Sequence, residues 1–249
     1  MPVPPVAPAA HDAPPADDAA TCGGLAPGIE SVPVDRIRGA ITPTAQQNDI
    51  LNQLQQASAK ADGILQASCP KTLPLTPVNR LETIATRLEA MTQAIDLIRP
   101  QLTSLDQSLD AKQREAFDGL EYAKGQTSGP AQDLAALCKP QTASFTALPV
   151  TQIEAEIQPV RDQKAAFEAL KTAAQTAAQK LAPSCPADTP KTLAERFDAV
   201  RRRLTDLHDA VYSMEPSLTH FYSALSDEQK ARFNVITAGS QQATGKPGN

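Results

Sequence analysis

The sequence predicts an all-α protein built from two tandem homologous three-helix units, and three observations support this fold class. The four cysteines, Cys22, Cys69, Cys138 and Cys185, form two pairs with the same spacing of 47 residues, and the second pair is the first shifted by 116. Apolar residues in both copies recur at steps of three and four, the period of an amphipathic α-helix. Helix-start signals also stand at equivalent positions in both copies.

The 116-residue offset continues without gaps through the rest of each copy. It aligns Pro33 with Pro149 and Pro100 with Pro216. An ungapped register over about a hundred residues indicates an internal repeat. The predicted organisation is a Pro/Ala-rich disordered linker at 1–21, a first helical unit at 22–120, a connector at 121–137, a second helical unit at 138–236 and a disordered tail at 237–249.

The first helix of the first unit is predicted to begin at Thr42-Pro43, because threonine caps helices well and proline fits the first helical position. It should end near Ser68-Cys69-Pro70. Between these limits a row of apolar residues lines one face: Ile50, Leu51, Leu54, Ala57, Ala61, Ile64 and Leu65.

The second helix is the longest one predicted in each unit. It starts at Thr76-Pro77, and the second copy adds Thr192 and Glu195 with the spacing of a capping box. Pro100 and Pro216 are expected to kink these helices. Eighteen apolar positions form a coiled-coil-like seam: Leu81, Ile84, Leu88, Met91, Ile95, Ile98, Leu102, Leu105 and Leu109, and in the copy Phe197, Val200, Leu204, Leu207, Val211, Met214, Leu218, Phe221 and Leu225.

The third helix begins at a short motif that recurs in both units. In the first unit Leu109 is followed by Asp110 and Gln113, and in the second Leu225 is followed by Ser226 and Gln229. Asp or Ser at the N-cap with Gln three residues later is the spacing of a capping box. The primary role of these residues is therefore expected to be structural.

At these residues the sequence resembles the LTXXQ-motif family, the Spy/CpxP-like periplasmic proteins, most clearly in LSDEQKARF at 225–233. The segment from Ile41 to Gln47 and its copy from Ile157 to Gln163 look like degenerate versions of the family's other motif. The resemblance covers both repeats. It implies a small all-helical protein of the periplasm that acts as an ATP-independent chaperone or as a stress-sensing regulator. Because relatives pair two single units into a cradle, it also implies a pseudo-dimer within one chain.

The cysteines are predicted to form two disulfides, one within each unit. All three possible connectivities respect the repeat, but an ancestral single unit would have had only its own two cysteines. We therefore expect Cys22 to pair with Cys69 and Cys138 with Cys185. Each bond would close a 47-residue loop, stabilise its unit by about 4 kcal/mol and require an oxidising compartment. The alternative is four buried free thiols; a zinc site fits less well, since no Cys-x-x-Cys spacing exists.

Composition and motifs exclude several classes of function. The net charge is −5, which argues against a nucleic-acid binder. The sequence has no run of 18 apolar residues, the length that a membrane span would need. The first 20 residues resemble a stalk that follows a signal peptide or anchor missing from this sequence. No phosphate-binding glycine loop, His-Glu-x-x-His or Gly-x-Ser-x-Gly motif is present, so we expect no enzyme activity and no cofactor.

Two histidines of the second unit, His208 and His220, keep metal binding open as an alternative. They replace Thr92 and Ser104 of the first unit. Twelve residues of helix separate them by roughly 18 Å, which is too far for one ion without further ligands. Ordinary surface histidines are the favoured interpretation, and no metal site is predicted.

Four repeated arginines border the apolar seam and suggest a surface that captures partly unfolded proteins. The competing interpretation is that their stems cover the core. Soft and aromatic residues of the seam have the same two readings. The candidate client-binding residues are Arg80, Arg87, Arg196, Arg203, Met91, Met214, Phe221 and Tyr222.

The function expected from the resemblance is an ATP-independent periplasmic holdase. Its rivals are a metal-responsive sensor and a structural envelope protein without chaperone activity.

Overall fold

A computed structural model describes residues 32–72, 74–124, 149–185 and 193–244, and these residues confirm the all-α prediction. They contain eight α-helices and one 3-10 turn, and no strand. The first unit comprises α2 (Val34–Ile41), α3 (Ala45–Ala67), α4 (Pro77–Ser108) and α5 (Ala111–Lys124). The second comprises α7 (Val150–Ile157), α8 (Asp162–Leu181), η1 (Ala182–Ser184), α9 (Leu193–Ala224) and α10 (Asp227–Thr244).

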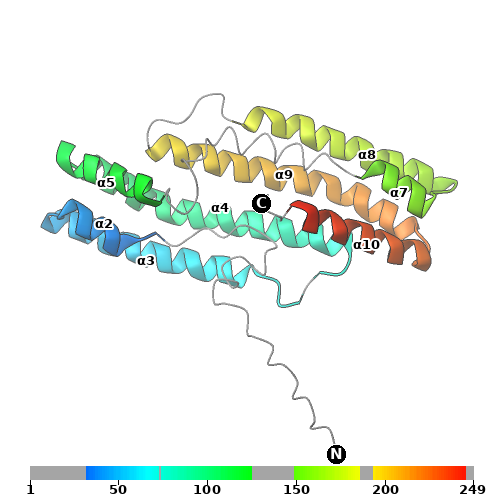
Figure 1. Cartoon of the computed structure of the whole chain (residues 1–249), viewed down its shortest axis with the longest axis horizontal. Helices are drawn as coiled ribbons and strands as arrows, with labels where there is room; N and C mark the ends of the chain where they lie inside the picture. Colours follow the sequence, from blue (N-terminus) through cyan, green and yellow to red (C-terminus); the bar gives the residue numbers. More distant parts are fainter. Residues whose placement is uncertain (1–31, 73, 125–148, 186–192, 245–249) are drawn as a thin grey trace, which may run out of the picture.

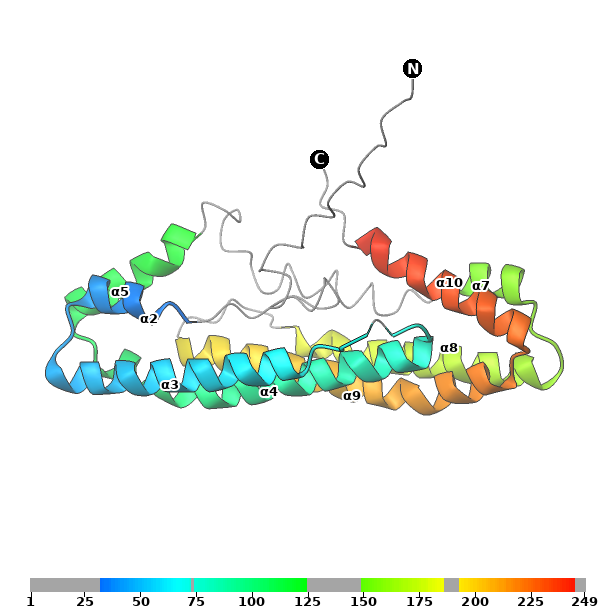
Figure 2. The ribbon, with the colours of Figure 1, turned by 90° about the horizontal axis from the view of Figure 1, so that it is seen from below.

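The four long helices lie side by side in one layer, in the order α3, α4, α9, α8 (Figure 1). Each runs antiparallel to its neighbour, and the contact between α4 and α9 joins the two units. The pairs α2/α5 and α7/α10 stand at opposite ends of the layer and rise on the same side of it (Figure 2). The described helices therefore form an elongated layer with a pair of short helices on the same side at each end.

Each unit has its own apolar core, and the two cores extend into one another. The first core is built from buried residues of α2, α3, α4 and α5, and the second mainly from α7, α8, α9 and α10. Phe197 of α9 packs against the first core, while Leu81, its repeat equivalent on α4, packs against the second. The contact between the units is thus reciprocal, as the 116-residue repeat would require of two similar halves.

The predicted seam of α4 and α9 is buried or half-buried along its whole length. None of its eighteen residues is exposed, and Leu105 and Phe221 are fully buried. Both helices run unbroken through Pro100 and Pro216, so the prolines do not interrupt them. The predicted cap of α4 is present, since the Thr76 side chain accepts a hydrogen bond from the Asn79 N–H at 3.2 Å. Thr192, the other predicted cap, lies outside the described residues.

The predicted start of the first long helix is wrong by two residues. Thr42 is the C-cap of the short helix α2, with φ of 47°, and the true N-cap of α3 is Thr44. A residue that precedes proline is disfavoured in the α region, which explains why α2 ends before Pro43. Because α7 repeats α2, each unit has four α-helices among the described residues rather than three.

Candidate functional site

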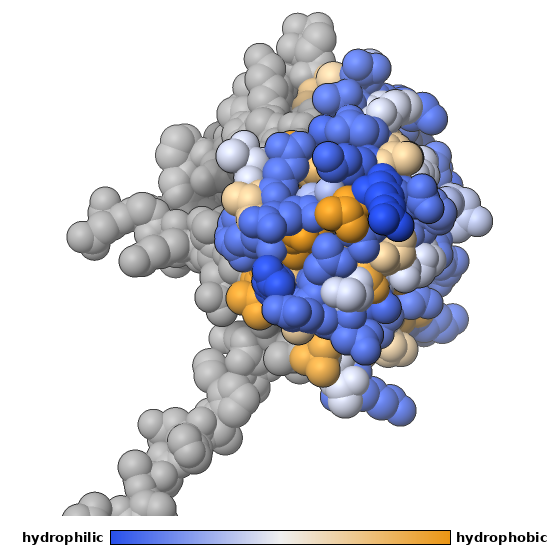
Figure 3. Space-filling view, turned by 90° about the vertical axis from the view of Figure 1, so that its right-hand side faces the viewer, coloured by the Kyte–Doolittle hydropathy of each residue, from blue (hydrophilic) through white to orange (hydrophobic). Residues whose placement is uncertain are grey.

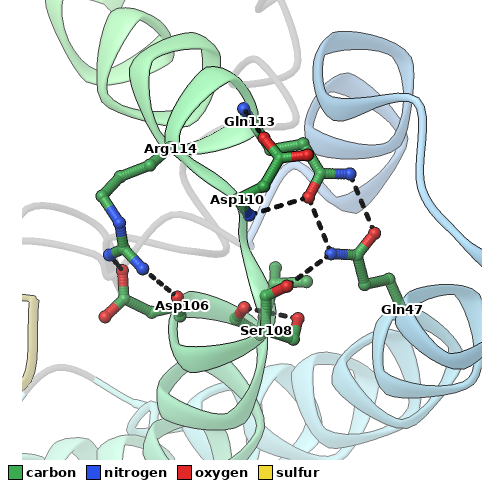
Figure 4. Close-up of polar contacts among 7 residues, drawn as sticks. Gln47, Asp106, Ser108, Asp110, Gln113 and Arg114 are labelled. Atoms are coloured by element: carbon green, nitrogen blue, oxygen red, sulfur yellow. Dashed lines mark hydrogen bonds and ion pairs between the residues drawn. The ribbon is translucent and has the colours of Figure 1, made fainter.

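Two glutamines of the first unit form a reciprocal pair where four helices meet (Figure 4). Gln47 lies in the first turn of α3 and Gln113 in the first turn of α5. Gln47 Nε2 donates to Gln113 Oε1 at 2.8 Å, and Gln113 Nε2 donates to Gln47 Oε1 at 2.9 Å. Gln47 is only 3% exposed, so its amide needs protein partners.

The remaining bonds of this pair connect the neighbouring helix ends. Gln47 Nε2 also donates to the Ser108 carbonyl at 2.8 Å, at the end of α4, and Gln113 Nε2 donates to the Ile41 carbonyl at 3.1 Å, at the end of α2. Each Oε1 accepts the N–H of its own N-cap residue, Thr44 at 2.9 Å for Gln47 and Asp110 at 3.1 Å for Gln113. One amide pair therefore fixes two helix starts and two helix ends, and we call it the glutamine junction.

The glutamine junction is repeated in the second unit by Gln163 and Gln229. Their amides exchange hydrogen bonds of 2.9 and 3.1 Å. Gln163 donates to the Ala224 carbonyl and Gln229 to the Ile157 carbonyl, each at 2.9 Å. The N-cap side chains of α5 and α10 complete their capping boxes: Gln113 N–H donates to Asp110 Oδ1 at 2.8 Å and Gln229 N–H to Ser226 Oγ at 3.3 Å.

One cap differs between the two glutamine junctions. Val160 stands where the first unit has Thr44, so no side chain caps α8, and the next residue, Arg161, adopts φ of 44° and ψ of −119°. Gln163 Oε1 still accepts the Val160 N–H at 3.1 Å. Positive φ is costly for a residue with a Cβ atom. The start of α8 is therefore less well stabilised than the start of α3.

The chemistry of the glutamine junctions is structural. Their bonds join neutral amides to backbone groups and supply neither a nucleophile nor an acid or base. Sequence reasoning found the capping boxes but missed the pairing between the glutamines. The available signal was the recurrence of the same separation, since Gln47 and Gln113 are as far apart in sequence as Gln163 and Gln229.

Two of the predicted client-binding arginines are buried, so this part of the prediction is wrong. Arg87 is 3% exposed and Arg203 is 8% exposed. Arg87 donates to the Leu65 carbonyl and, at 2.8 Å, to Ser68 Oγ, at the carboxyl end of α3. Burial lowers the pKa of Arg87 below its ordinary value. A cation at this position satisfies the free carbonyls of the helix end and opposes the negative end of its dipole.

Arg203 repeats the arrangement at the end of α8. It donates to the Leu181 carbonyl at 3.0 Å and to Ser184 Oγ at 2.6 Å. Burial lowers the pKa of Arg203, and the nearby carboxylate of Asp206 opposes this effect. Both arginines thus hold a helix end from inside the unit and cannot form an exposed rim.

The other candidate client-binding residues are divided between core and surface. Phe221 is fully buried, so it is not a surface residue. Its ring packs at a tilt against Phe167 and edge-on against Phe233, with centroids 5.1 and 5.5 Å away. Arg196 is exposed. The half-buried candidates are Arg80, Met91, Met214 and Tyr222.

Arg80 links the two units through backbone carbonyls. Its guanidinium donates to Pro74 at 3.1 Å, to Leu75 at 3.1 Å and, across the units, to Asn234 of α10 at 3.3 Å. The Leu75 side chain beside this contact is 75% exposed, and Val235, next to Asn234, is 71% exposed. These two apolar residues were not predicted as surface residues.

Large exposed apolar side chains are few among the described residues. Tyr212 on α9 and Val160 before α8 join Leu75 and Val235 in this set. Figure 3 views the end of the molecule that carries α7 and α10 and shows apolar side chains in small separate patches between hydrophilic ones. This end of the molecule therefore offers dispersed apolar contacts.

The histidines do not come together in a metal site. His208 lies 3.4 Å from an Asp209 oxygen and stacks with Tyr212 at 6.3 Å, and His220 is exposed. In the described ranges no group of three or more His, Cys, Asp or Glu residues could hold a metal ion.

Two of the four cysteines lie within the described residues. Cys69 and Cys185 are each disulfide-bonded, next to the helix ends held by Arg87 and Arg203. Cys22 and Cys138 lie outside the described residues. The pairing of Cys22 with Cys69 and of Cys138 with Cys185 therefore stays a prediction.

The fold and the two glutamine junctions define a duplicated helical protein in which one glutamine pair joins the helix ends of each unit. A family model described as the LTXXQ motif family protein matches residues 30–121 and 145–237, and the chain therefore belongs to this family in a tandem duplicated form. No curated protein and no solved structure matches the chain. None of the described helices has the length and the apolar character that a membrane span requires.

Proposed function

We propose that this protein is an ATP-independent holdase of the periplasm that binds partly unfolded proteins, acts without catalysis and needs no cofactor. The observation that carries the proposal is the duplicated family match over two helical units whose long helices lie in one layer. In this proposal the contact between α4 and α9 corresponds to the interface of a dimer of single units, and here both units belong to one covalent chain. The unit boundaries predicted above, 22–120 and 138–236, belong to the same proposal.

The client surface in this proposal differs from the one predicted from sequence alone. It uses the dispersed exposed apolar residues Leu75, Tyr212 and Val235. Arg80, which donates to the Leu75 carbonyl, lies beside the first of them, and the exposed Arg196 supplies positive charge at the start of α9. A net charge of −5 gives little long-range attraction for acidic clients. Capture should therefore depend on local apolar contact and should survive moderate salt, which screens exposed charges beyond about 8 Å.

Light scattering of a chemically denatured client protein, diluted into buffer without ATP, tests the proposal. Equimolar protein should lower the scattering at both low and moderate salt. Scattering that stays at the level of client alone in both buffers would rule out the holdase. Periplasmic localisation is tested separately by fractionating cells that express the gene from its natural start.

A further inference from the structure

We infer that the ion pair between Asp96 and Arg201 determines which units pair with one another. It favours the contact between the first and the second unit and disfavours contacts between like units from two copies. The inference goes beyond the proposed function, because it concerns which surfaces recognise one another and does not depend on client binding. The partner that the α4 face fits is the α9 face, not a second α4 face.

Two ion pairs cross the contact between the antiparallel helices α4 and α9. Arg201 donates to both carboxylate oxygens of Asp96, at 2.6 and 3.1 Å, and Arg99 lies 2.7 Å from Asp198. The four side chains are 40–43% exposed, so each pair is partly shielded from water. The hydrogen bonds that Arg201 donates to Asp96 also raise the pKa of Arg201.

The repeat reveals which of these pairs distinguishes unlike from like units. Under the 116-residue offset, Asp96 corresponds to Tyr212 and Arg201 corresponds to Ala85. Were two first units to pair in the same antiparallel register, Asp96 would face Ala85. Were two second units to pair, Arg201 would face Tyr212. Only unlike units give both charges an opposite charge.

The second ion pair discriminates differently. Arg99 corresponds to Glu215, and Asp198 corresponds to Glu82. Two first units would still join Arg99 to Glu82, but two second units would set Glu215 against Asp198 twice. Like charges at such positions repel. Pairing of like units from two copies would therefore lose both Asp96–Arg201 pairs, and the pair of second units would gain only like-charge contacts.

The exposure of Tyr212 agrees with this asymmetry. The side chain is 66% exposed, at the half of the contact where the register brings it opposite Ala85. The part of the α4–α9 contact that holds the ion pairs is therefore the part that distinguishes unlike from like units. A covalent tether favours pairing within one chain whatever the charges, so the test needs a control with the same tether.

The test compares the full-length chain with three variants by size-exclusion chromatography with light scattering, over a wide range of protein concentration. Arg201→Asp sets two carboxylates, at positions 96 and 201, against each other in the contact within the chain. In a contact between two second units, the new carboxylate would face Tyr212 instead. The variant should raise the dimer association constant about tenfold and allow exchange with a differently tagged copy. Asp96→Arg combined with Arg201→Asp restores an ion pair and should return the wild-type association. Arg202→Asp, the exposed neighbour, makes the same change in net charge and should match wild type.

Circular dichroism shows whether each variant keeps its helices. If Arg201→Asp fails to fold, Asp96→Ala serves instead, and it should raise dimer association above the Arg202→Asp control by a smaller factor. The inference is overturned if the variant that folds associates no more than Arg202→Asp, or if the charge swap does not restore the wild-type value.

Discussion

Arg203 is a buried cation that closes the carboxyl end of α8, and its neighbour Arg202 is exposed. This pair gives a matched test of buried and exposed arginines. Arg203→Met keeps much of the apolar stem but removes the bonds to Leu181 and Ser184, and it should lower the free energy of unfolding by about 2–3 kcal/mol. Arg202→Met should change it by less than about 0.5 kcal/mol. Urea unfolding followed by circular dichroism measures both, and equal effects would contradict the assigned role of Arg203.

Gln113 donates two hydrogen bonds that a carboxylate cannot make, to Ile41 and to Gln47. Gln113→Glu should therefore destabilise the protein by about 2–3 kcal/mol at pH 7, because acceptors would face acceptors. A protonated carboxyl can donate one bond, and the surrounding acceptors should raise the pKa of the introduced carboxyl above its ordinary value of about 4.3. The loss should therefore shrink as pH falls from 7 towards about 4.3. The difference in melting temperature between variant and wild type, measured from pH 7 to pH 4, checks this. A difference that does not depend on pH would mean that the two donated bonds contribute little.

At the scale of elements, the two glutamine junctions differ in the cap of their long helix. Replacing Val160 and Arg161 by Thr and Ala copies the Thr44-Ala45 start of α3. It should restore a side-chain cap and remove the positive φ of Arg161, and raise the free energy of unfolding by about 1–2 kcal/mol. Thr44→Val in the first unit should have the opposite sign. Thermal unfolding measures both, and a loss of stability in the Thr-Ala variant would contradict the comparison.

The helices show how far local sequence rules reach. The long helices and the caps at Thr76, Asp110 and Ser226 follow from apolar period and capping residues, which are local signals. The short helices α2 and α7 were missed because eight residues carry little periodic signal and a prolyl residue follows closely. The glutamine junctions and the burial of Arg87 depend on tertiary contacts between helices far apart in sequence, which no local rule supplies.

At the scale of the whole molecule, the interlocked cores predict that the two units unfold together. Phe197 of the second unit packs against the first core and Leu81 of the first packs against the second. Differential scanning calorimetry should therefore show one cooperative transition. Phe197→Ala should lower the midpoint of this transition. Truncation of a fully buried aromatic side chain costs about 3 kcal/mol or more. The cost should be smaller here, because Phe197 is half-buried. Two separate transitions in the wild type would show that the contact between α4 and α9 does not couple the units.

In the proposed function, exposed apolar residues on the helical frame hold unfolded clients without ATP. The most direct measurement is client aggregation, followed by light scattering, with wild type and with the triple variant Leu75→Ser, Tyr212→Ser and Val235→Ser. Because all three side chains are mostly exposed, the variant should keep the wild-type melting temperature. Equimolar wild type should suppress aggregation, and the variant should lose at least about half of this effect. Suppression by the variant equal to that of wild type would contradict the assigned surface, and no suppression by wild type would contradict the holdase itself.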